Sequence, residues 1–154
     1  MNIQIAAAAV KKSVTVEAPI ERAFSAFAAM GDWWVKTHTI AASDQKDVTM
    51  EPRAGGRWYE TGMNGEQCDW GKVAEWQPPH RMLLLWQISA DWKFDPDLIT
   101  EVEVRFTEEG KNRTRVELEH RKLEAYGAAA KAMAESFGSE GGWSGLLAAY
   151  AKAC

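Results

Sequence analysis

The alternation of hydrophobic and polar residues predicts that the chain begins with a strand followed by a short helix. Residues 13–17 (SVTVE) alternate polar and apolar positions, which is typical of a strand with one buried face. After Pro19 the apolar residues change to the helical spacing i, i+3, i+4 and i+7: Ile20, Ala23, Phe24 and Phe27. Because Pro favours the first turn of a helix and Gly31 follows the stripe, we expect an amphipathic helix that ends before Gly31.

The middle of the chain reads as consecutive strands. Every segment between them contains Gly, Pro, Asn or Asp, residues that favour turns for backbone reasons. Since no helical stripe intervenes, the strands are expected to pair antiparallel. Six segments are predicted: Asp47–Glu51, Arg57–Thr61, Glu66–Trp76, Arg81–Ser89, Ile99–Thr107 and Thr114–His120.

The predicted strands differ in how clearly apolar and polar residues separate onto two faces. In the last two strands, apolar residues such as Val104 and Leu118 alternate with charged residues such as Glu103 and Glu117, which predicts one buried and one solvated face. The segment Glu66–Trp76 has no cleanly apolar face. Such a mixed pattern is typical of a strand with a bulge, and the alternative is a strand that lines a wet cavity.

The end of the chain returns to helical spacing. Two helices are expected, at residues 123–137 and 140–152, each with one apolar side, and glycines interrupt the pattern between them. The predicted order of strand, helix, six strands and helices indicates an α+β fold, an antiparallel sheet with helices packed on one face.

Composition and charge narrow the function. With 154 residues, of which 46% are hydrophobic, we expect a single domain over residues 1–154 with a sizeable core. The net charge is −4 and the Lys and Arg residues are dispersed, so the sequence has no basic patch for nucleic acid and no such partner is expected. Cys68 and Cys154 form neither a disulfide framework nor a zinc motif. Since disulfides are rare in a reducing compartment, we expect the protein to be located in the cytoplasm. The apolar stretch at residues 3–10 is too short for a membrane anchor.

Tryptophan is unusually abundant, with eight residues against three Tyr and five Phe. Such a number indicates a large aromatic core or a lined cavity. The pair Trp33-Trp34 follows the first helix, where it can cover one end of a core. Trp58, Trp86 and Trp143 are expected to approach one interior space from two strands and the last helix.

Seven short segments, in the same order along the chain, resemble the START-like (helix-grip, SRPBCC) superfamily, in particular the branch named after the activator of the heat-shock-protein-90 ATPase. They are Glu17-Ala18-Pro19 with Phe24, Trp33-Trp34, Pro52–Gly56, Gly71–Glu75, Pro78–Arg81 with Trp86, His120, and Gly142-Trp143 with Leu146 and Leu147. The resemblance implies a curved antiparallel sheet of about seven strands around a C-terminal helix, with a short helix after the first strand. It also implies an apolar cavity that holds a hydrophobic small molecule in many relatives.

We therefore expect non-covalent binding of a hydrophobic or aromatic small molecule, without a cofactor. Two alternatives are a co-chaperone-like module that docks on a chaperone or another protein, and an enzyme of the cyclase or dehydratase kind. Catalysis is the less favoured class because no catalytic motif is legible. The expected ligand-binding residues are Trp33, Trp34, Trp58, Trp86, Phe106, His120 and Trp143.

Candidate chemistry is sparse. His120 lies in the inward register of the last strand and is the expected polar contact to the ligand, or the general base if the protein is an enzyme. Asp69 and Glu75 are the alternative carboxylate bases. His38 and His80 fall in predicted loops, and no His or Cys pair has metal-ligand spacing, so no metal is expected.

Overall fold

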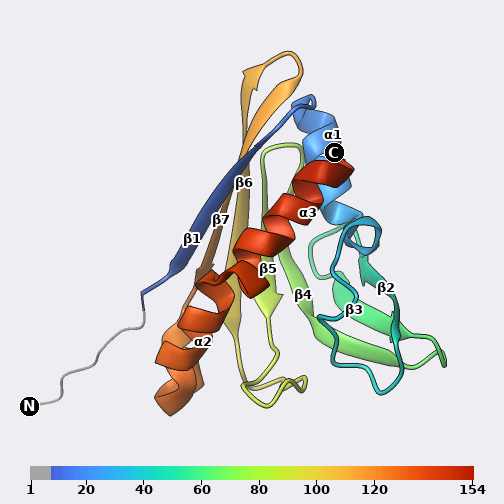
Figure 1. The fold of residues 1–154 in the computed structure, drawn as a ribbon, viewed down its shortest axis with the longest axis vertical. Helices are drawn as coiled ribbons and strands as arrows, with labels where there is room; N and C mark the ends of the chain where they lie inside the picture. Colours follow the sequence, from blue (N-terminus) through green and yellow to red (C-terminus); the bar gives the residue numbers. More distant parts are fainter. Residues whose placement is uncertain (1–7) are drawn as a thin grey trace, which may run out of the picture.

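The computed structural model describes residues 8–154, so most of the apolar stretch at residues 3–10 lies outside the described residues. Seven antiparallel strands form one sheet in the order β1-β7-β6-β5-β4-β3-β2. Figure 1 shows this sheet curving around the C-terminal helices. The strands are β1 (Val10–Val16), β2 (Gln45–Met50), β3 (Arg57–Gly62), β4 (Gln67–Gln77), β5 (Arg81–Trp86), β6 (Thr100–Gly110) and β7 (Arg113–Arg121).

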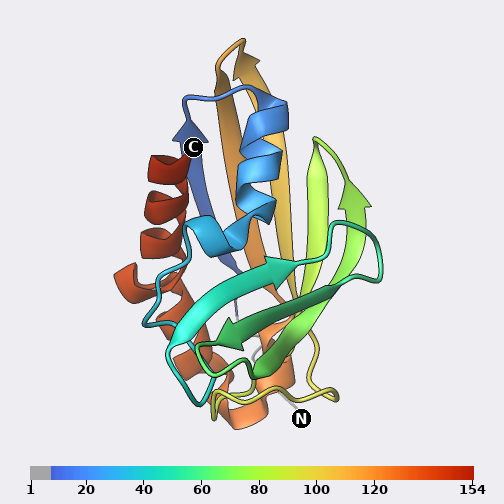
Figure 2. The same cartoon turned by 90° about the vertical axis from the view of Figure 1, so that its right-hand side faces the viewer.

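The curvature divides the sheet into two halves. In Figure 2 the strands β2 and β3 run at a steep angle to β6 and β7, and the helices lie inside the bend. Bulges in β4 contribute to this bend. Trp70 is the extra residue where Trp58 pairs with Gly71 and Tyr59 with Asp69. A second shift in register occurs further along the strand, opposite β5.

The bulges explain the mixed pattern predicted for the fourth strand. A bulge shifts the inward–outward alternation by one position, so one parity cannot describe the whole strand. Trp70 and Gly71 are neighbours in the sequence and both are buried. The sequence prediction of a bulge in this strand is thus confirmed.

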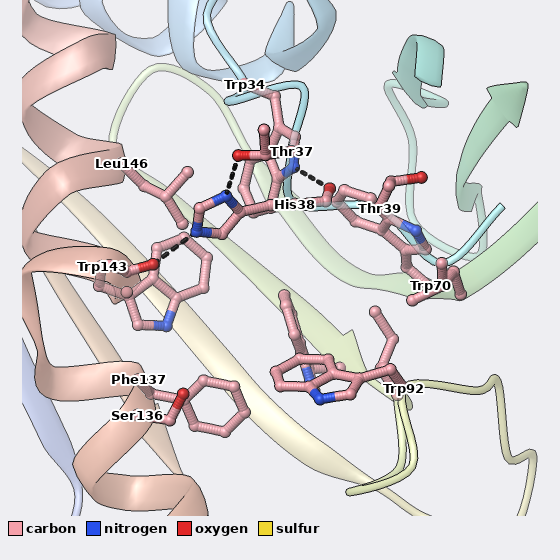
Figure 3. A pocket seen from close by; sticks show the side chains of 15 residues that line it. Trp34, Thr37, His38, Thr39, Trp70, Trp92, Ser136, Phe137, Trp143 and Leu146 are labelled. Atoms are coloured by element: carbon pink, nitrogen blue, oxygen red, sulfur yellow. Dashed lines mark hydrogen bonds between the residues drawn. The ribbon is translucent and has the colours of Figure 1, made fainter. Parts of the chain in front are cut away.

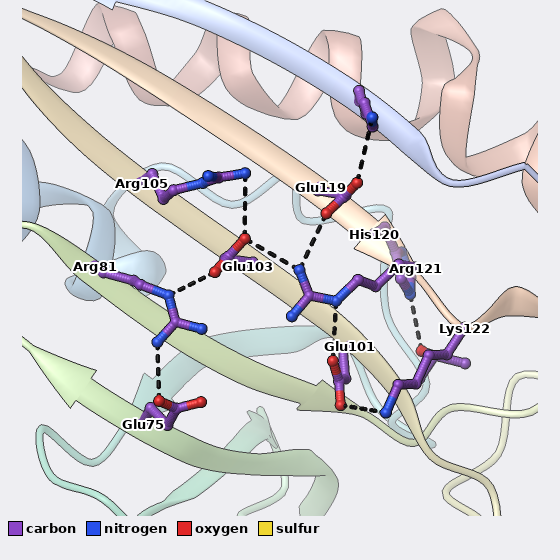
Figure 4. A network of polar contacts seen from close by, with 11 residues as sticks. Glu75, Arg81, Glu101, Glu103, Arg105, Glu119, His120, Arg121 and Lys122 are labelled. Carbon is purple, nitrogen blue, oxygen red and sulfur yellow. Dashed lines mark hydrogen bonds and ion pairs between the residues drawn. The ribbon is translucent and has the colours of Figure 1, made fainter.

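The outer face of β5, β6 and β7 carries the charged residues that the alternation predicts. Three guanidinium groups contact Glu103: its carboxylate accepts hydrogen bonds from Arg81 and Arg121 and forms an ion pair with Arg105. Figure 4 shows the extended network, in which Arg121 also contacts Glu101 and Glu119. On the opposite face of the same strands, buried apolar residues form the core.

The helix α1 (Ile20–Ala28) packs its predicted stripe into one half of the core. The ring of Phe24 lies 4.9 Å from that of Trp76 and 5.1 Å from that of Phe106. Phe27 contacts Phe106 and also Tyr150 of the last helix. This half of the interior is filled by side chains.

The C-terminal segment is more broken than the sequence predicts. The expected helix at residues 123–137 begins as a 3-10 segment, Leu123–Ala129, and becomes helix α2 only at Ala130–Gly138. The expected helix at 140–152 begins as a π-helical turn, Glu140–Ser144, before α3 (Gly145–Ala153).

Two glycines explain these breaks. Gly127 has φ 59°, in the left-handed region that favours glycine. At Gly142, a Cβ atom would lie 2.3 Å from the carbonyl oxygen of Phe137. A side chain is therefore excluded at the bend between α2 and α3.

The fifth strand ends earlier than predicted, at Trp86 instead of Ser89. The backbone N–H of Gln87 still bonds the carbonyl of Trp70, but its own carbonyl accepts from Asp95. Residues 87–99 therefore form a folded loop at the end of the sheet. Among the described residues, no helix is long and apolar enough to cross a membrane.

Candidate functional site

A cavity of about 360 Å³ lies between the concave face of the sheet, residues 34–40 and the bend between α2 and α3. Figure 3 shows that side chains from the loop, the sheet and the helices converge on it. The lining is mostly aromatic and aliphatic, as in small-molecule sites generally. The residues are Trp34, Thr37, His38, Thr39, Ile40, Trp70, Trp86, Ile88, Trp92, Ser136, Phe137, Gly141, Gly142, Trp143 and Leu146.

One pocket tryptophan is fixed by a buried histidine. The indole N–H of Trp143 donates to Nδ1 of His120 at 3.1 Å. Because indole is a donor only, Nδ1 of His120 must be the acceptor and the ring proton lies on Nε2. Nε2 then donates to the hydroxyl of Thr100 at 2.8 Å, and this hydroxyl donates to the carbonyl of Trp86 at 2.9 Å. The chain of bonds links the π-helical turn before α3 to β5, β6 and β7.

The same geometry keeps His120 neutral. Its side chain is fully buried, and desolvation lowers its pKa to about 3. Both ring nitrogens have protein partners, and the ring lies beneath Trp143 and Phe137, outside the set of lining residues. His120 therefore positions the ring of Trp143.

A second buried polar group supports the opposite wall. Glu60 is fully buried, and its two carboxylate oxygens accept four hydrogen bonds. The donors are the hydroxyl of Thr39 at 2.6 Å, the backbone N–H of Ile40 at 2.6 Å, Nε2 of Gln45 at 3.2 Å and the indole of Trp70 at 3.0 Å. Three of these four residues line the cavity. Glu60 thus ties the loop and a pocket tryptophan to the sheet.

The loop that closes the cavity is also bound to the helices. Nε2 of His38 lies 2.5 Å from the carbonyl oxygen of Gly141, and its Nδ1 lies 3.4 Å from the hydroxyl of Thr37 (Figure 3). The carbonyl of His38 accepts from the indole N–H of Trp34 at 2.9 Å. Among the described residues that line the cavity, His38 is the one with an imidazole side chain.

Three of the seven expected ligand-binding residues line the cavity: Trp34, Trp86 and Trp143. The structure places Trp33, Trp58, Phe106 and His120 outside its lining. Phe106 packs on α1, at the other end of the interior.

The two expected tryptophans outside the lining have core positions. Trp33 donates its indole N–H to the carbonyl of Ala26 and packs against Tyr150. Trp58 is fully buried under the pocket tryptophans, with its indole N–H 3.4 Å from Sδ of Met30. Trp58 therefore supports the pocket wall from behind.

The two suspected carboxylate bases do not reach the cavity. Asp69 forms an ion pair with Arg57 at 2.7 Å, and Glu75 forms one with Arg81 at 2.9 Å. Neither carboxylate belongs to the lining. The alternation along the strands did not distinguish these two residues from Glu60, which is the carboxylate buried behind the cavity wall.

Several lining residues were missed by the sequence analysis. Thr37, His38 and Thr39 lie in a loop without periodicity, so no pattern indicates their direction. Trp70 sits at a bulge, where the alternation changes parity. The abundance of tryptophan was the one available signal for this residue.

Trp92 forms part of the pocket mouth. It lies in the loop after β5, is 48% exposed and lines the cavity. Its φ of 61° is a left-handed conformation that is unfavourable for a bulky side chain. The fold therefore holds an exposed indole at the entrance in a strained position.

In the part of the chain that the structure describes, no group of three or more His, Cys, Asp or Glu residues is arranged to hold a metal ion. Cys68 and Cys154 are free thiols.

Comparisons with known proteins identify the family and the fold. Residues 17–152 match the family model described as Activator of Hsp90 ATPase homolog 1-like protein. An anthrahydroquino-gamma-pyrone synthase, Txn09, complexed with SUM, is 35% identical; the match covers 99% of this chain and 100% of that one, with a TM-score of 0.68. Among curated proteins, none matches the chain significantly.

Two more distant structures share the fold. The self-sacrificing resistance protein CalC from Micromonospora echinospora is 26% identical over 95% of this chain and 93% of that one, with a TM-score of 0.66. Protein NE0264 from Nitrosomonas europaea is 12% identical over 99% and 97%, with a TM-score of 0.68, and shows the fold alone. The chain thus belongs to the family of Activator of Hsp90 ATPase homolog 1-like proteins, and its sheet curved around the C-terminal helices is the START-like, helix-grip fold.

Proposed function

We propose that this protein binds a flat, hydrophobic aromatic molecule in the tryptophan-lined cavity. The observation that carries the proposal is that five indole rings surround one space of about 360 Å³. The lining residues are Trp34, Trp70, Trp86, Trp92 and Trp143. Indole rings offer large rigid faces on which flat ligands stack, and a volume of this size is ordinary for a small-molecule site.

Hydrogen bonds pre-organise this set of rings. The indole N–H groups of Trp34, Trp70 and Trp143 are each bonded to a buried or partly buried protein acceptor. The three rings are therefore held in fixed orientations around the cavity. Pre-organisation of this kind reduces the entropy lost on binding.

The choice between a pocket ligand and a docked protein partner depends on where the aromatic surface lies. Trp92 is the one tryptophan of the eight that is exposed, and it stands at the pocket mouth. A protein-docking surface requires a contiguous exposed apolar patch. The concentration of indoles inside the cavity favours the small molecule.

Isothermal titration calorimetry with 1-hydroxyanthraquinone, a neutral flat probe, tests the proposal. Ser136 is exposed on α2 and lines the cavity mouth, so Ser136→Trp should obstruct entry and weaken binding by tenfold or more (about 1.4 kcal/mol). Ala132 is exposed on the same helix but lies outside the lining, so Ala132→Trp is the matched control. Equal binding by both variants, or no binding by the unmodified protein, would contradict the proposal.

A second candidate function is catalysis of a ring closure in the same cavity. Two observations favour it: His38 is the titratable group of the lining, and a 35% identical protein is a pyrone synthase. Nδ1 of His38, which faces the hydroxyl of Thr37, would take the proton of a ligand hydroxyl as that oxygen adds to an unsaturated ketone. The same proton then returns to the adjacent carbon, so the product is an isomer of the substrate.

This second function is tested with an aryl ynone that carries a neighbouring hydroxyl group. Chromatography should detect cyclised product, and His38→Gln should lower the rate by about 100-fold or more, the usual contribution of a general base. His80 is exposed in the turn before β5, outside the cavity lining, and His80→Gln serves as the control. A rate that is the same in both variants would remove His38 from the reaction.

A further inference from the structure

The walls of the cavity favour a positively charged ligand over a negatively charged one. The lining of the cavity holds five indole rings and contains neither Lys nor Arg among the described residues. The face of an aromatic ring is the negative side of its quadrupole, and tryptophan presents the strongest such face. A cation that contacts the face of one of these rings is therefore favoured over an anion at the same place.

Glu60 places a formal charge behind the same walls. Each of its two oxygens accepts two hydrogen bonds, so the donors occupy all four acceptor sites of an ionised carboxylate. None of the ion pairs formed by the described residues includes Glu60. The negative charge is therefore hydrogen-bonded but not compensated by a cation.

The charge of Glu60 lies close enough to the cavity to act on a ligand. Glu60 is fully buried, and two of its partners, Thr39 and Trp70, separate it from the space that they line. The hydroxyl proton of Thr39 and the indole proton of Trp70 point to the carboxylate. The Thr39 oxygen also accepts the backbone N–H of Ala41 at 3.1 Å, which leaves its remaining lone pair and the ring of Trp70 for a ligand. Charges inside a protein act over longer distances than in water, because the surroundings screen them less.

We propose that the cavity discriminates between ligands by charge, accepting an aromatic molecule with a positively charged nitrogen and rejecting carboxylates. An aromatic enclosure backed by a carboxylate stabilises a cation through both the ring quadrupoles and the Coulomb field. This inference rests on the proposed function, since it concerns the ligand class of the same cavity. Glu60 is the residue that determines the preference, and the tryptophans provide the contact surface.

The test uses three probes of nearly equal shape: 1-methylquinolinium, its neutral isostere 1-methylnaphthalene, and the anion 1-naphthoate. Quenching of tryptophan fluorescence gives the three dissociation constants. We expect the cation to bind at least as tightly as the neutral probe, although its hydration opposes transfer into a cavity. We expect the anion to bind at least tenfold more weakly than either.

Two variants that each remove one negative charge test whether Glu60 causes the preference for the cation. Glu60→Gln should weaken binding of the cation about tenfold more than binding of the neutral probe, a difference of about 1.4 kcal/mol, because any shift of the wall that Glu60 holds affects both probes alike. Glu108→Gln removes the same charge at an exposed position of β6 and should change none of the three constants. If Glu60→Gln does not fold, Trp92→Leu replaces it, because the exposed indole of Trp92 can be removed without opening the core. That variant should weaken the cation about threefold more than the neutral probe, the amount expected for one exposed cation–π contact.

The outcomes separate the inference from the proposed function. If 1-methylnaphthalene binds more tightly than the cation, or if Glu60→Gln weakens all three probes equally, the charge preference is refuted and aromatic binding stands. If none of the three probes binds, the proposed function fails, and the inference fails with it.

Discussion

The neutral, buried state of His120 predicts a specific loss of stability in mild acid. In the folded protein its pKa is about 3, against an ordinary value of 6.5, because burial penalises the charged ring. Above pH 6.5 both folded and unfolded states hold a neutral ring. Between pH 6.5 and pH 3, only the unfolded state binds a proton at this site, so stability falls as the pH is lowered.

The magnitude follows from the pKa difference. Each pH unit in this window favours unfolding by about 1.4 kcal/mol. A change from pH 7 to pH 4.5 crosses about two units of the window, so His120 alone should lower the free energy of unfolding by about 2.7 kcal/mol. This is a large part of the 5–15 kcal/mol typical of a folded domain.

Urea unfolding of the unmodified protein and of His120→Phe at the two pH values isolates this contribution. His120→Phe should cost about 1–3 kcal/mol at pH 7, because the indole of Trp143 and the hydroxyl of Thr100 each lose a partner. Its further loss between pH 7 and pH 4.5 should be smaller than that of the unmodified protein by about 2.7 kcal/mol. All other titrating groups are common to both proteins and cancel in the comparison.

Equal losses in the two proteins would refute the reasoning, since they would show that His120 titrates in the folded state at an ordinary pH. Should the variant be too unstable to measure, the carbon-bound ring protons of His120 in the unmodified protein give an independent test by NMR. Their chemical shifts should remain those of a neutral ring down to about pH 4. A midpoint near 6.5 would again contradict the prediction.

Three further predictions concern stability. Trp143→Ala should lower the free energy of unfolding by about 3–5 kcal/mol, because its side chain is almost fully buried, and a loss below about 1 kcal/mol in denaturant unfolding would contradict its anchoring role. Desolvation raises the pKa of Glu103, but hydrogen bonds from Arg81 and Arg121 outweigh it, and the net pKa is lowered. The stability that Glu103 contributes is therefore present at neutral pH and lost as the pH falls, so Glu103→Gln should be less stable at pH 7 and show a weaker acid dependence in urea unfolding. A chelator should leave the melting temperature unchanged in a thermal-shift assay, and a clear decrease would reveal a bound metal.

Local periodicity determined most of the secondary structure. The stripe that includes Phe24 and Phe27 predicted α1, and the alternation around Val104 and Leu118 predicted the inner face of β6 and β7. These patterns work because each residue's direction within a regular element depends only on its neighbours in the chain. The glycines between the two C-terminal stripes marked the bend at Gly142. The break at Gly127 escaped the pattern, because a stripe of apolar residues does not report on local backbone bends.

The composition of the cavity, in contrast, was decided by the tertiary structure. Trp34, Trp86 and Trp143 are far apart in the sequence and meet only when the sheet curves around the C-terminal helices. The same burial that places Trp143 in the lining places His120 beneath it. The sequence by itself determined that many aromatic residues are buried. Which of them line a cavity depends on bulges, loop paths and contacts between distant segments, and these are set by packing of the whole chain.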